Sequence, residues 1–102
     1  MTRLSSLAEK ISAILKDRHD TVAVSESSTG GLVSAALLAV PGASAYFTGG
    51  VVVYTGPARD TFLGIDLDQH KGMRSASEPY ALLAAATVRE RLDATWGLRE
   101  TG

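Results

Sequence analysis

The sequence predicts a domain of the layered α/β class, and three observations carry this prediction. Short β-branched apolar runs alternate with segments of helical periodicity along the 102 residues, as in proteins whose strands are separated by helices. Apolar residues make up 45% of the composition, enough for one core, so we expect residues 1–102 to form a single domain. The run GGVVVYT is apolar almost throughout, which favours a sheet covered on both faces.

The composition excludes several classes of protein and site. Ten basic side chains against eleven acidic ones create no overall field, so we expect neither nucleic acid nor a membrane as a partner. The absence of cysteine excludes a disulfide framework and thiolate metal sites. His19 and His70 stand in separate polar stretches, so we expect no metal. The N-terminus lacks a signal-peptide pattern and no apolar run reaches the roughly 20 residues of a membrane span, so we expect a cytoplasmic protein.

The first half of the chain predicts helix, strand and helix. Apolar residues between Leu4 and Leu15 recur at helical spacing and predict an amphipathic helix. TVAVS, from Thr21 to Ser25, has the length and the β-branched residues of a buried strand. SSTGGLVSAALLAV opens with cap-type residues and continues as an apolar helix up to Pro41, which cannot prolong it.

The second half predicts two strands and two helices. GGVVVYT, from Gly49 to Thr55, is a strand, and GPARDTFLGI fits a short helix with Pro57 in its first turn. DLDQHKGMRSA is polar and unperiodic and predicts a loop. Ser77 can cap the helix EPYALLAAATVRERLDA. TWGLRETG begins like a further strand.

The segment SESSTGGL is a candidate site for an anion. It follows the first strand and starts the second helix, where free backbone N–H groups and the helix dipole attract negative charge. Its hydroxyls add donors and its glycines permit close approach of a ligand, although it lacks the lysine of a P-loop. The alternative is a well-capped helix packed on the sheet, in which Glu26 caps the backbone instead of contacting a ribose hydroxyl. The candidate substrate- or phosphate-binding residues are Glu26, Ser27, Ser28, Thr29, Gly30, Gly31, Gly49 and Gly50.

The stretch AVSESSTGGLVSAALLAVPGASAYFTGGVVVYTGPARDTFLGI resembles the core of the CinA C-terminal domain family, whose characterised members are nicotinamide-nucleotide amidohydrolases (NMN deamidases). The resemblance runs from about Val22 to Gly102 and includes SASEPYALLAAA and the final ETG. It implies a three-layer α/β/α sandwich around a mixed sheet. It also implies hydrolysis of nicotinamide mononucleotide (NMN) to nicotinic acid mononucleotide and ammonia, without a metal or other cofactor, so the expected ligand is an NMN-like nucleotide.

The resemblance assigns four catalytic candidates: Ser44, Tyr54, Arg59 and Thr101. Amide hydrolysis needs a nucleophile, an acid for the departing ammonia and donors to the oxyanion. Arg59 stands where the family has lysine, and because it stays protonated it cannot act as a base. The other interpretation makes Ser44 a turn hydroxyl, Tyr54 a core-edge aromatic and Arg59 a solvated charge. Five strand residues span roughly 17 Å, so Ser44 reaches Tyr54 only if the chain folds back or a second subunit supplies one group.

The family pattern continues beyond Thr101 and Gly102 into a glycine-rich loop. We therefore expect an incomplete domain that corresponds to the N-terminal two-thirds of the family domain. The expected protein partner is a second copy of the chain or a complementary C-terminal segment. Two alternatives to an active amidohydrolase stay open, namely a degenerate member that retains the nucleotide pocket and a non-catalytic nucleotide-binding or assembly module.

Overall fold

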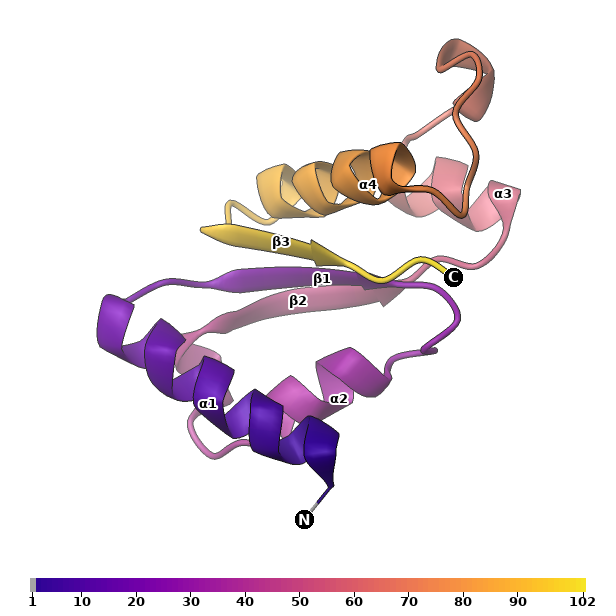
Figure 1. Ribbon diagram of the computed structural model, residues 1–102. Helices are drawn as coiled ribbons and strands as arrows, with labels where there is room; N and C mark the ends of the chain where they lie inside the picture. The colour runs from indigo at the N-terminus through magenta and orange to yellow at the C-terminus, as the bar shows by residue number, and fades with distance from the viewer. Residues whose placement is uncertain (1) are drawn as a thin grey trace.

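The computed structural model describes residues 2–102 as alternating helices and strands (Figure 1). The elements are α1 (Arg3–Arg18), β1 (Val22–Glu26), α2 (Leu32–Leu38), β2 (Phe47–Val52), α3 (Gly56–Ala58), α4 (Glu78–Arg91) and β3 (Trp96–Arg99). One short 3-10 turn, η1 (Ala43–Ala45), precedes β2, a single π-type turn, η2 (Arg59–Leu63), follows α3, and another 3-10 turn, η3 (Leu67–Gln69), lies before α4. The α/β class predicted from the sequence is confirmed.

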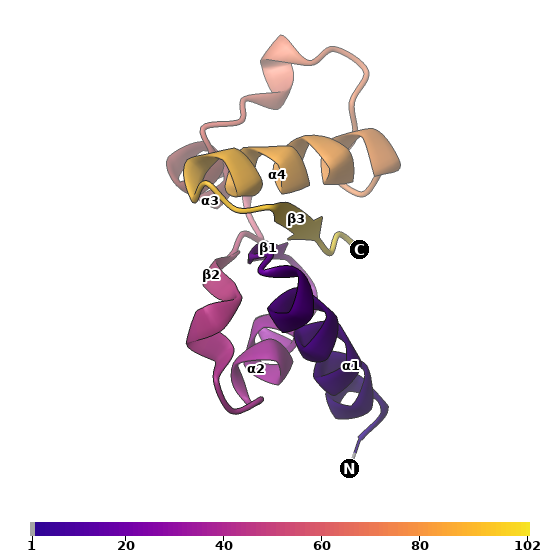
Figure 2. The same ribbon diagram turned by 90° about the vertical axis from the view of Figure 1, so that its left-hand side faces the viewer.

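The helices cover both faces of a three-stranded sheet. Helices α1 and α2 lie on one face, and α3 and α4 lie on the other (Figures 1 and 2). The three-layer arrangement is therefore confirmed. The strand order is β2-β1-β3 and both pairings are parallel, so the antiparallel strand that a mixed sheet requires does not occur among residues 2–102.

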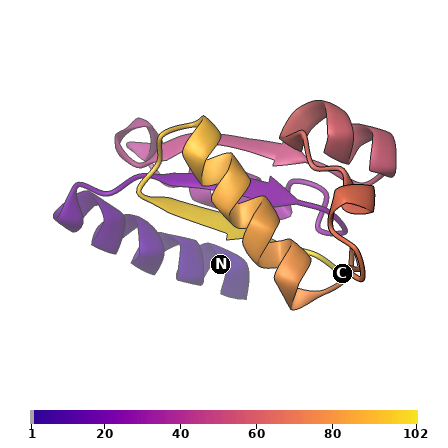
Figure 3. The same ribbon diagram turned by 90° about the horizontal axis from the view of Figure 1, so that it is seen from above.

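Strand β1 is central and every residue in it is buried. Its Ser25 pairs with Val51 of β2 and with Arg99 of β3. Because all three strands run in the same direction, their carboxyl ends meet at one edge of the sheet (Figure 3). In open parallel sheets this edge is the usual location of a ligand site.

Two apolar clusters form the core, one on each face of the sheet. The α4 side contains Ala23, Val53, Leu63, Ile65, Tyr80, Ala84, Val88 and Ala94. The α1 and α2 side contains Ala8, Leu15, Val22, Val24, Leu37 and Tyr46. Helix α4 approaches β3 closely at Gly97, where a side-chain Cβ would collide with the carbonyl oxygen of Ala85.

The outer edge of β3 borders an apolar groove of about 350 Å³. Ile11 and Ile14 of α1 line it together with Trp96 and Leu98 of β3. The ring of Trp96 is about half exposed, and its Nε1 donates to Asp20 Oδ2 at 2.9 Å. In the part of the chain that the structure describes, no helix has the length and apolar character to cross a membrane.

Candidate functional site

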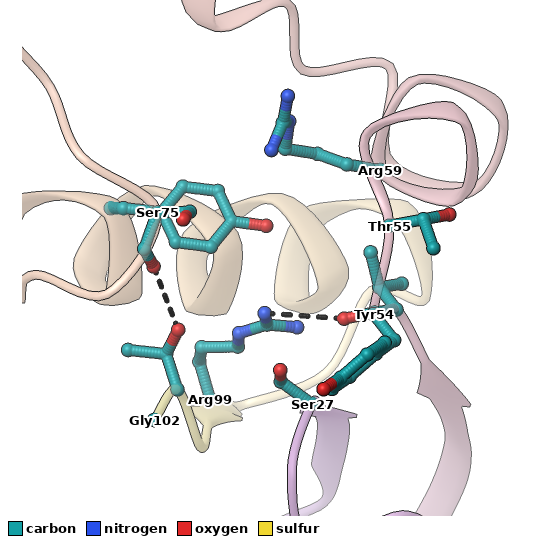
Figure 4. A pocket seen from close by; sticks show the side chains of 10 residues that line it. Ser27, Tyr54, Thr55, Arg59, Ser75, Arg99 and Gly102 are labelled. Atoms are coloured by element: carbon teal, nitrogen blue, oxygen red, sulfur yellow. Dashed lines mark hydrogen bonds between the residues drawn. The ribbon is translucent and has the colours of Figure 1, made fainter.

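A cavity of about 280 Å³ opens at the carboxyl edge of the sheet (Figure 4). Its walls come from the loop after β1, the end of β2, the start of η2, the segment before α4, α4 itself and the end of β3. The lining residues are Ser27, Val53, Tyr54, Thr55, Arg59, Ser75, Tyr80, Arg99, Thr101 and Gly102.

Three of the four catalytic candidates line this cavity. Tyr54 follows β2 and is 75% exposed, and Arg59 lies at the start of η2. Thr101 follows β3, and its hydroxyl donates to the carbonyl of Ser75 at 2.8 Å. The structure thus brings together residues from three separate segments. Their catalytic roles stay a prediction.

Ser44 lies apart from the other three candidates. It belongs to η1 and is exposed at the amino end of β2, whereas the cavity is at the carboxyl end of that strand. Strand β2 runs from Phe47 to Val52 without folding back, and a strand of that length spans roughly 20 Å. The expectation that one chain could bring Ser44 to Tyr54 by folding back is therefore wrong, because the residues between them form a continuous strand.

The loop Ser27–Gly31, expected to hold an anion, is already occupied by two carboxylates of the protein. Glu26, at the end of β1, accepts hydrogen bonds from the amides of Gly31, Val33 and Ser34 at 3.2, 2.9 and 2.9 Å. Glu100, just after β3, accepts from the amides of Ser27 and Thr29 at 2.8 and 3.0 Å and from the Ser28 hydroxyl at 2.6 Å. The hydroxyl of Thr29 lies 2.7 Å from both carboxylates.

A phosphate bound at Ser27, Ser28, Thr29, Gly30 and Gly31 would have to displace these carboxylates, so the structure does not favour this site, and the binding role of these residues stays a prediction. The amides that open the second helix donate to the protein's own carboxylates and are not free to bind an anion. The alternative, a capped helix with Glu26 as its cap, agrees with the structure. Of the loop residues, Ser27 alone also lines the cavity.

Gly49 and Gly50 were also expected to contact substrate, and this expectation stays a prediction. They lie inside β2, paired with Ala23 and Val24, and do not line the cavity at the carboxyl edge. A Cβ at Gly50 would collide with the Ser34 hydroxyl. This glycine therefore lets β2 approach α2 closely.

The pKa values of both loop carboxyls are lowered by their hydrogen bonds. For Glu26, burial raises the pKa, but hydrogen bonds from Ser34, Thr29 and Val33 outweigh this effect and lower it. The Ser28 hydroxyl is the main cause that lowers the pKa of Glu100 to about 2, and bonds from Thr29 and Ser27 add to it against a smaller effect of burial. Both groups are therefore ionised at neutral pH.

Glu100 is expected to make the stability of the domain sensitive to acid. The pKa of Glu100 is about 2 in the folded protein, against an ordinary value of 4.5 that applies to the unfolded chain. Its contribution to the free energy of unfolding is therefore fully present above pH 4.5 and is lost as the pH falls towards 2. At pH 7, Glu100→Gln should lower the free energy of unfolding by about 1 to 2 kcal/mol, and this difference should shrink below pH 4. Urea denaturation at several pH values measures it. Glu90→Gln, an exposed matched control, should show no such pH-dependent difference, and a Glu100→Gln effect that is constant from pH 7 to pH 2.5 would contradict the assignment.

Arg99 is the charged lining residue that was not among the candidates predicted from the sequence; Val53, Thr55, Ser75, Tyr80 and Gly102 were not predicted either. The Nη1 of Arg99 donates to the Ser25 hydroxyl at 2.7 Å and to the Glu26 carbonyl at 3.3 Å, and its Nη2 donates to the Val53 carbonyl at 3.4 Å. Its guanidinium carbon lies 5.1 Å from the centre of the Tyr80 ring. The segment TWGLRE contains a signal for this residue. Side chains alternate between the two faces of a strand, so the charged residue that ends this short strand lies on one face of the sheet and its neighbour on the other.

The fold and the cavity define a three-layer α/β domain with a polar cavity at the carboxyl edge of parallel strands, where such sheets usually bind ligands. The model of the family described as "CinA C-terminal domain" matches residues 4–102. The chain belongs to the CinA C-terminal domain family.

Its curated relatives are longer proteins. A CinA-like protein of a Cyanothece species is 42% identical over 97 residues, which are 95% of this chain and 23% of that protein. A putative competence-damage inducible protein of Halothermothrix orenii is 39% identical over 98 residues, covering 96% of this chain and 24% of that protein. The chain thus spans less than a quarter of the length of these relatives.

Solved structures share the fold. Competence/damage inducible protein CihA of Agrobacterium tumefaciens matches with a TM-score of 0.82 and 30% identity, over 92% of this chain and 57% of that one. Competence damage-inducible protein A (ComA) of Klebsiella pneumoniae matches with a TM-score of 0.83 over 91% of this chain and 58% of that one, at 22% identity, which supports the fold alone.

Proposed function

We propose that the domain hydrolyses the carboxamide of NMN to nicotinic acid mononucleotide and ammonia, in the pocket at the carboxyl edge of the sheet. The observation that carries this proposal is the meeting of Tyr54, Arg59 and Thr101 in one cavity of about 280 Å³. Membership of the CinA C-terminal domain family supports it. The cavity is close to the lower end of the volumes common for small-molecule sites, about 300 Å³.

The three lining candidates have complementary chemistry for this reaction. The phenol of Tyr54 can pass a proton to the departing amine, and the guanidinium of Arg59 can donate to the oxyanion. The hydroxyl of Thr101 can do so only after it releases the carbonyl of Ser75. In the covalent route, a serine oxygen attacks the carbonyl carbon, the C–N bond breaks with release of ammonia, and water then hydrolyses the ester. If Ser44 is the attacking serine, this route needs the Ser44 of a second copy of the chain, because within one chain Ser44 lies at the other end of β2.

Ammonia release from NMN tests the proposal. We expect slow turnover by the natural chain, because Arg59 cannot accept a proton, and an increase of about 100-fold in Arg59→Lys, which restores a group able to act as a base. Ser44→Ala should abolish turnover and leave NMN binding unchanged. An equal mixture of Ser44→Ala and Tyr54→Phe chains should recover about a quarter of the activity if a dimer shares its sites.

A second candidate function is a nucleotide-binding module without turnover. Two observations favour it: an arginine occupies the position of the family's lysine, and Ser44 lies far from the pocket within one chain. This function predicts that NMN raises the thermal midpoint while neither the natural chain nor Arg59→Lys releases ammonia. That result would contradict the amidohydrolase proposal.

A further inference from the structure

The pocket contains two arginines that have no carboxylate partner. Between residues 2 and 102, the ion pairs are Arg18 with Asp20 and Arg89 with Glu90, so Arg59 and Arg99 belong to neither. The Nε of each pocket arginine is buried and has no hydrogen-bond partner within the described residues. A buried donor without an acceptor costs free energy, which an acceptor brought by a ligand would recover.

Arg99 is held in place by neutral groups only. Its acceptors are the Ser25 hydroxyl and the carbonyls of Glu26 and Val53, and its planar group lies over the ring of Tyr80. A guanidinium has five N–H donors, and these contacts engage three of them. Arg99 is thus fixed in orientation (Figure 4), keeps its full charge and retains donors for a further acceptor.

Within residues 2–102, the carboxylates near the pocket form no ion pair with Arg59 or Arg99. Glu100 follows Arg99 directly, but its carboxylate accepts from the loop after β1, and Glu26 accepts from the first amides of α2. Asp60 and Asp66 line a second cavity, which Arg59 also borders, and neither forms an ion pair with Arg59. Tyr54, Tyr80 and the other polar residues at the rim bear hydroxyl groups and no carboxylate. The residues that line the pocket therefore include two guanidinium groups and no carboxylate.

We propose that Arg99, together with Arg59, binds the ionised oxygens of the ligand, a phosphate or a carboxylate group on a small molecule. Guanidinium groups recognise both oxyanions through paired, charge-assisted hydrogen bonds. The inference rests on the proposed function for the choice of nucleotide. It moves the anion site from the amides of the loop after β1 to the two arginines at the ends of β3 and α3.

The oxyanion has two sources in that reaction. One is the phosphate of NMN, and the other is the carboxylate that hydrolysis creates on the ring. Nicotinamide riboside has neither group, NMN has the phosphate alone, and nicotinic acid mononucleotide has both. Comparing these three ligands therefore separates the sources.

Isothermal titration calorimetry on the 102-residue chain tests the inference with the three nucleotides and with inorganic phosphate. Arg99→Gln should weaken the binding of the oxyanion-bearing ligand by about 10- to 100-fold, the effect of losing a pair of charge-assisted hydrogen bonds. Arg99→Lys keeps the positive charge but loses the planar group with paired N–H donors, so it should weaken binding less than Arg99→Gln does. Arg3→Gln removes one positive charge from the exposed start of α1 and should change affinity less than twofold.

The pattern across ligands identifies the group that Arg99 holds. If NMN binding falls and riboside binding does not, the group is the phosphate. If only nicotinic acid mononucleotide is affected, the group is the carboxylate. Unchanged affinity of Arg99→Gln for all oxyanion ligands, or no oxyanion binding by the natural chain, overturns the inference.

Two controls keep the test decisive. Because Arg99 bonds to Ser25, Glu26 and Val53, circular dichroism must show that Arg99→Gln is folded. If Arg99→Gln does not fold, the same titrations are made with Arg59→Gln. An Arg59→Gln affinity for the oxyanion ligands equal to that of the natural chain then overturns the inference. Ammonia release reports separately on the proposed function. Oxyanion binding that depends on Arg99, without release of ammonia, supports this inference and rejects hydrolysis. Release of ammonia together with binding that does not depend on Arg99 supports hydrolysis and rejects this inference.

Discussion

Glu26→Gln is expected to lower the free energy of unfolding by about 3 kcal/mol or more. The carboxylate is fully buried, at 0% exposure, and accepts from the amides of Gly31, Val33 and Ser34, which open α2. Glutamine offers one acceptor oxygen in place of two and turns an NH2 group towards backbone N–H donors, which cannot accept a hydrogen bond from it. Hydrogen bonds to a charged group contribute about 1.5 to 3 kcal/mol each, and a buried donor left unpaired adds a desolvation cost.

Urea denaturation followed by circular dichroism measures this loss at pH 7. Glu9→Gln, the same change on the exposed face of α1, should stay within about 0.5 kcal/mol of the natural chain. Glu26→Asp should also be destabilising, because the shorter side chain withdraws from the amides of α2. A Glu26→Gln chain as stable as the Glu9→Gln chain would show that the buried carboxylate does not hold the start of α2.

Gly97→Ala is expected to destabilise the domain by about 3 kcal/mol. The new Cβ would collide with the carbonyl oxygen of Ala85 and lie 2.8 Å from the Cβ of Arg89, both on α4. A backbone carbonyl cannot rotate away as a flexible side chain can, so the whole helix must move off β3. The displacement would also move Tyr80, which lies under the guanidinium of Arg99, and should weaken oxyanion binding.

Gly56→Ala is the matched control for this substitution. A Cβ there would meet only the Nη2 of Arg59, at an ordinary distance of 3.5 Å. Thermal unfolding of the two variants should differ by more than 10 °C in midpoint, since about 3 kcal/mol corresponds to a shift of that order in a domain of this size. Equal midpoints would mean that α4 and β3 adjust to the added methyl group without cost.

Much of the fold follows from local patterns in the sequence. Periodicity predicted α1 and α4, and β-branched runs predicted β1 and β2, because these features depend on residues close together in the chain. The start of α2 was placed too early. The cap-type residues after β1 form a loop in which Gly30 and Gly31 have φ of 61° and 103°, so the helix begins only at Leu32.

The site was harder to predict because it depends on contacts between distant segments. The family resemblance identified Tyr54, Arg59 and Thr101, which line the pocket. It gave no indication that Glu100 would fill the loop after β1, because that contact joins residues more than 70 positions apart and exists only once β3 pairs with β1. Arg99 was missed for the same reason, since its partner Ser25 belongs to β1 and its partner Val53 follows β2.

The side chains of Arg99 and Glu100 make contacts at two different places of the sheet edge. Arg99 lies in the pocket, and Glu100 bonds to the loop after β1. In a strand, a displacement of one residue exchanges the two faces. A β3 shifted by one residue would bring a carboxylate next to the carbonyl oxygens of Glu26 and Val53 and a guanidinium against N–H donors, which is repulsive at both places. The two adjacent opposite charges thereby raise the energy of a shifted register of β3 during folding. The strand has four residues, too few to select the register by apolar contacts alone.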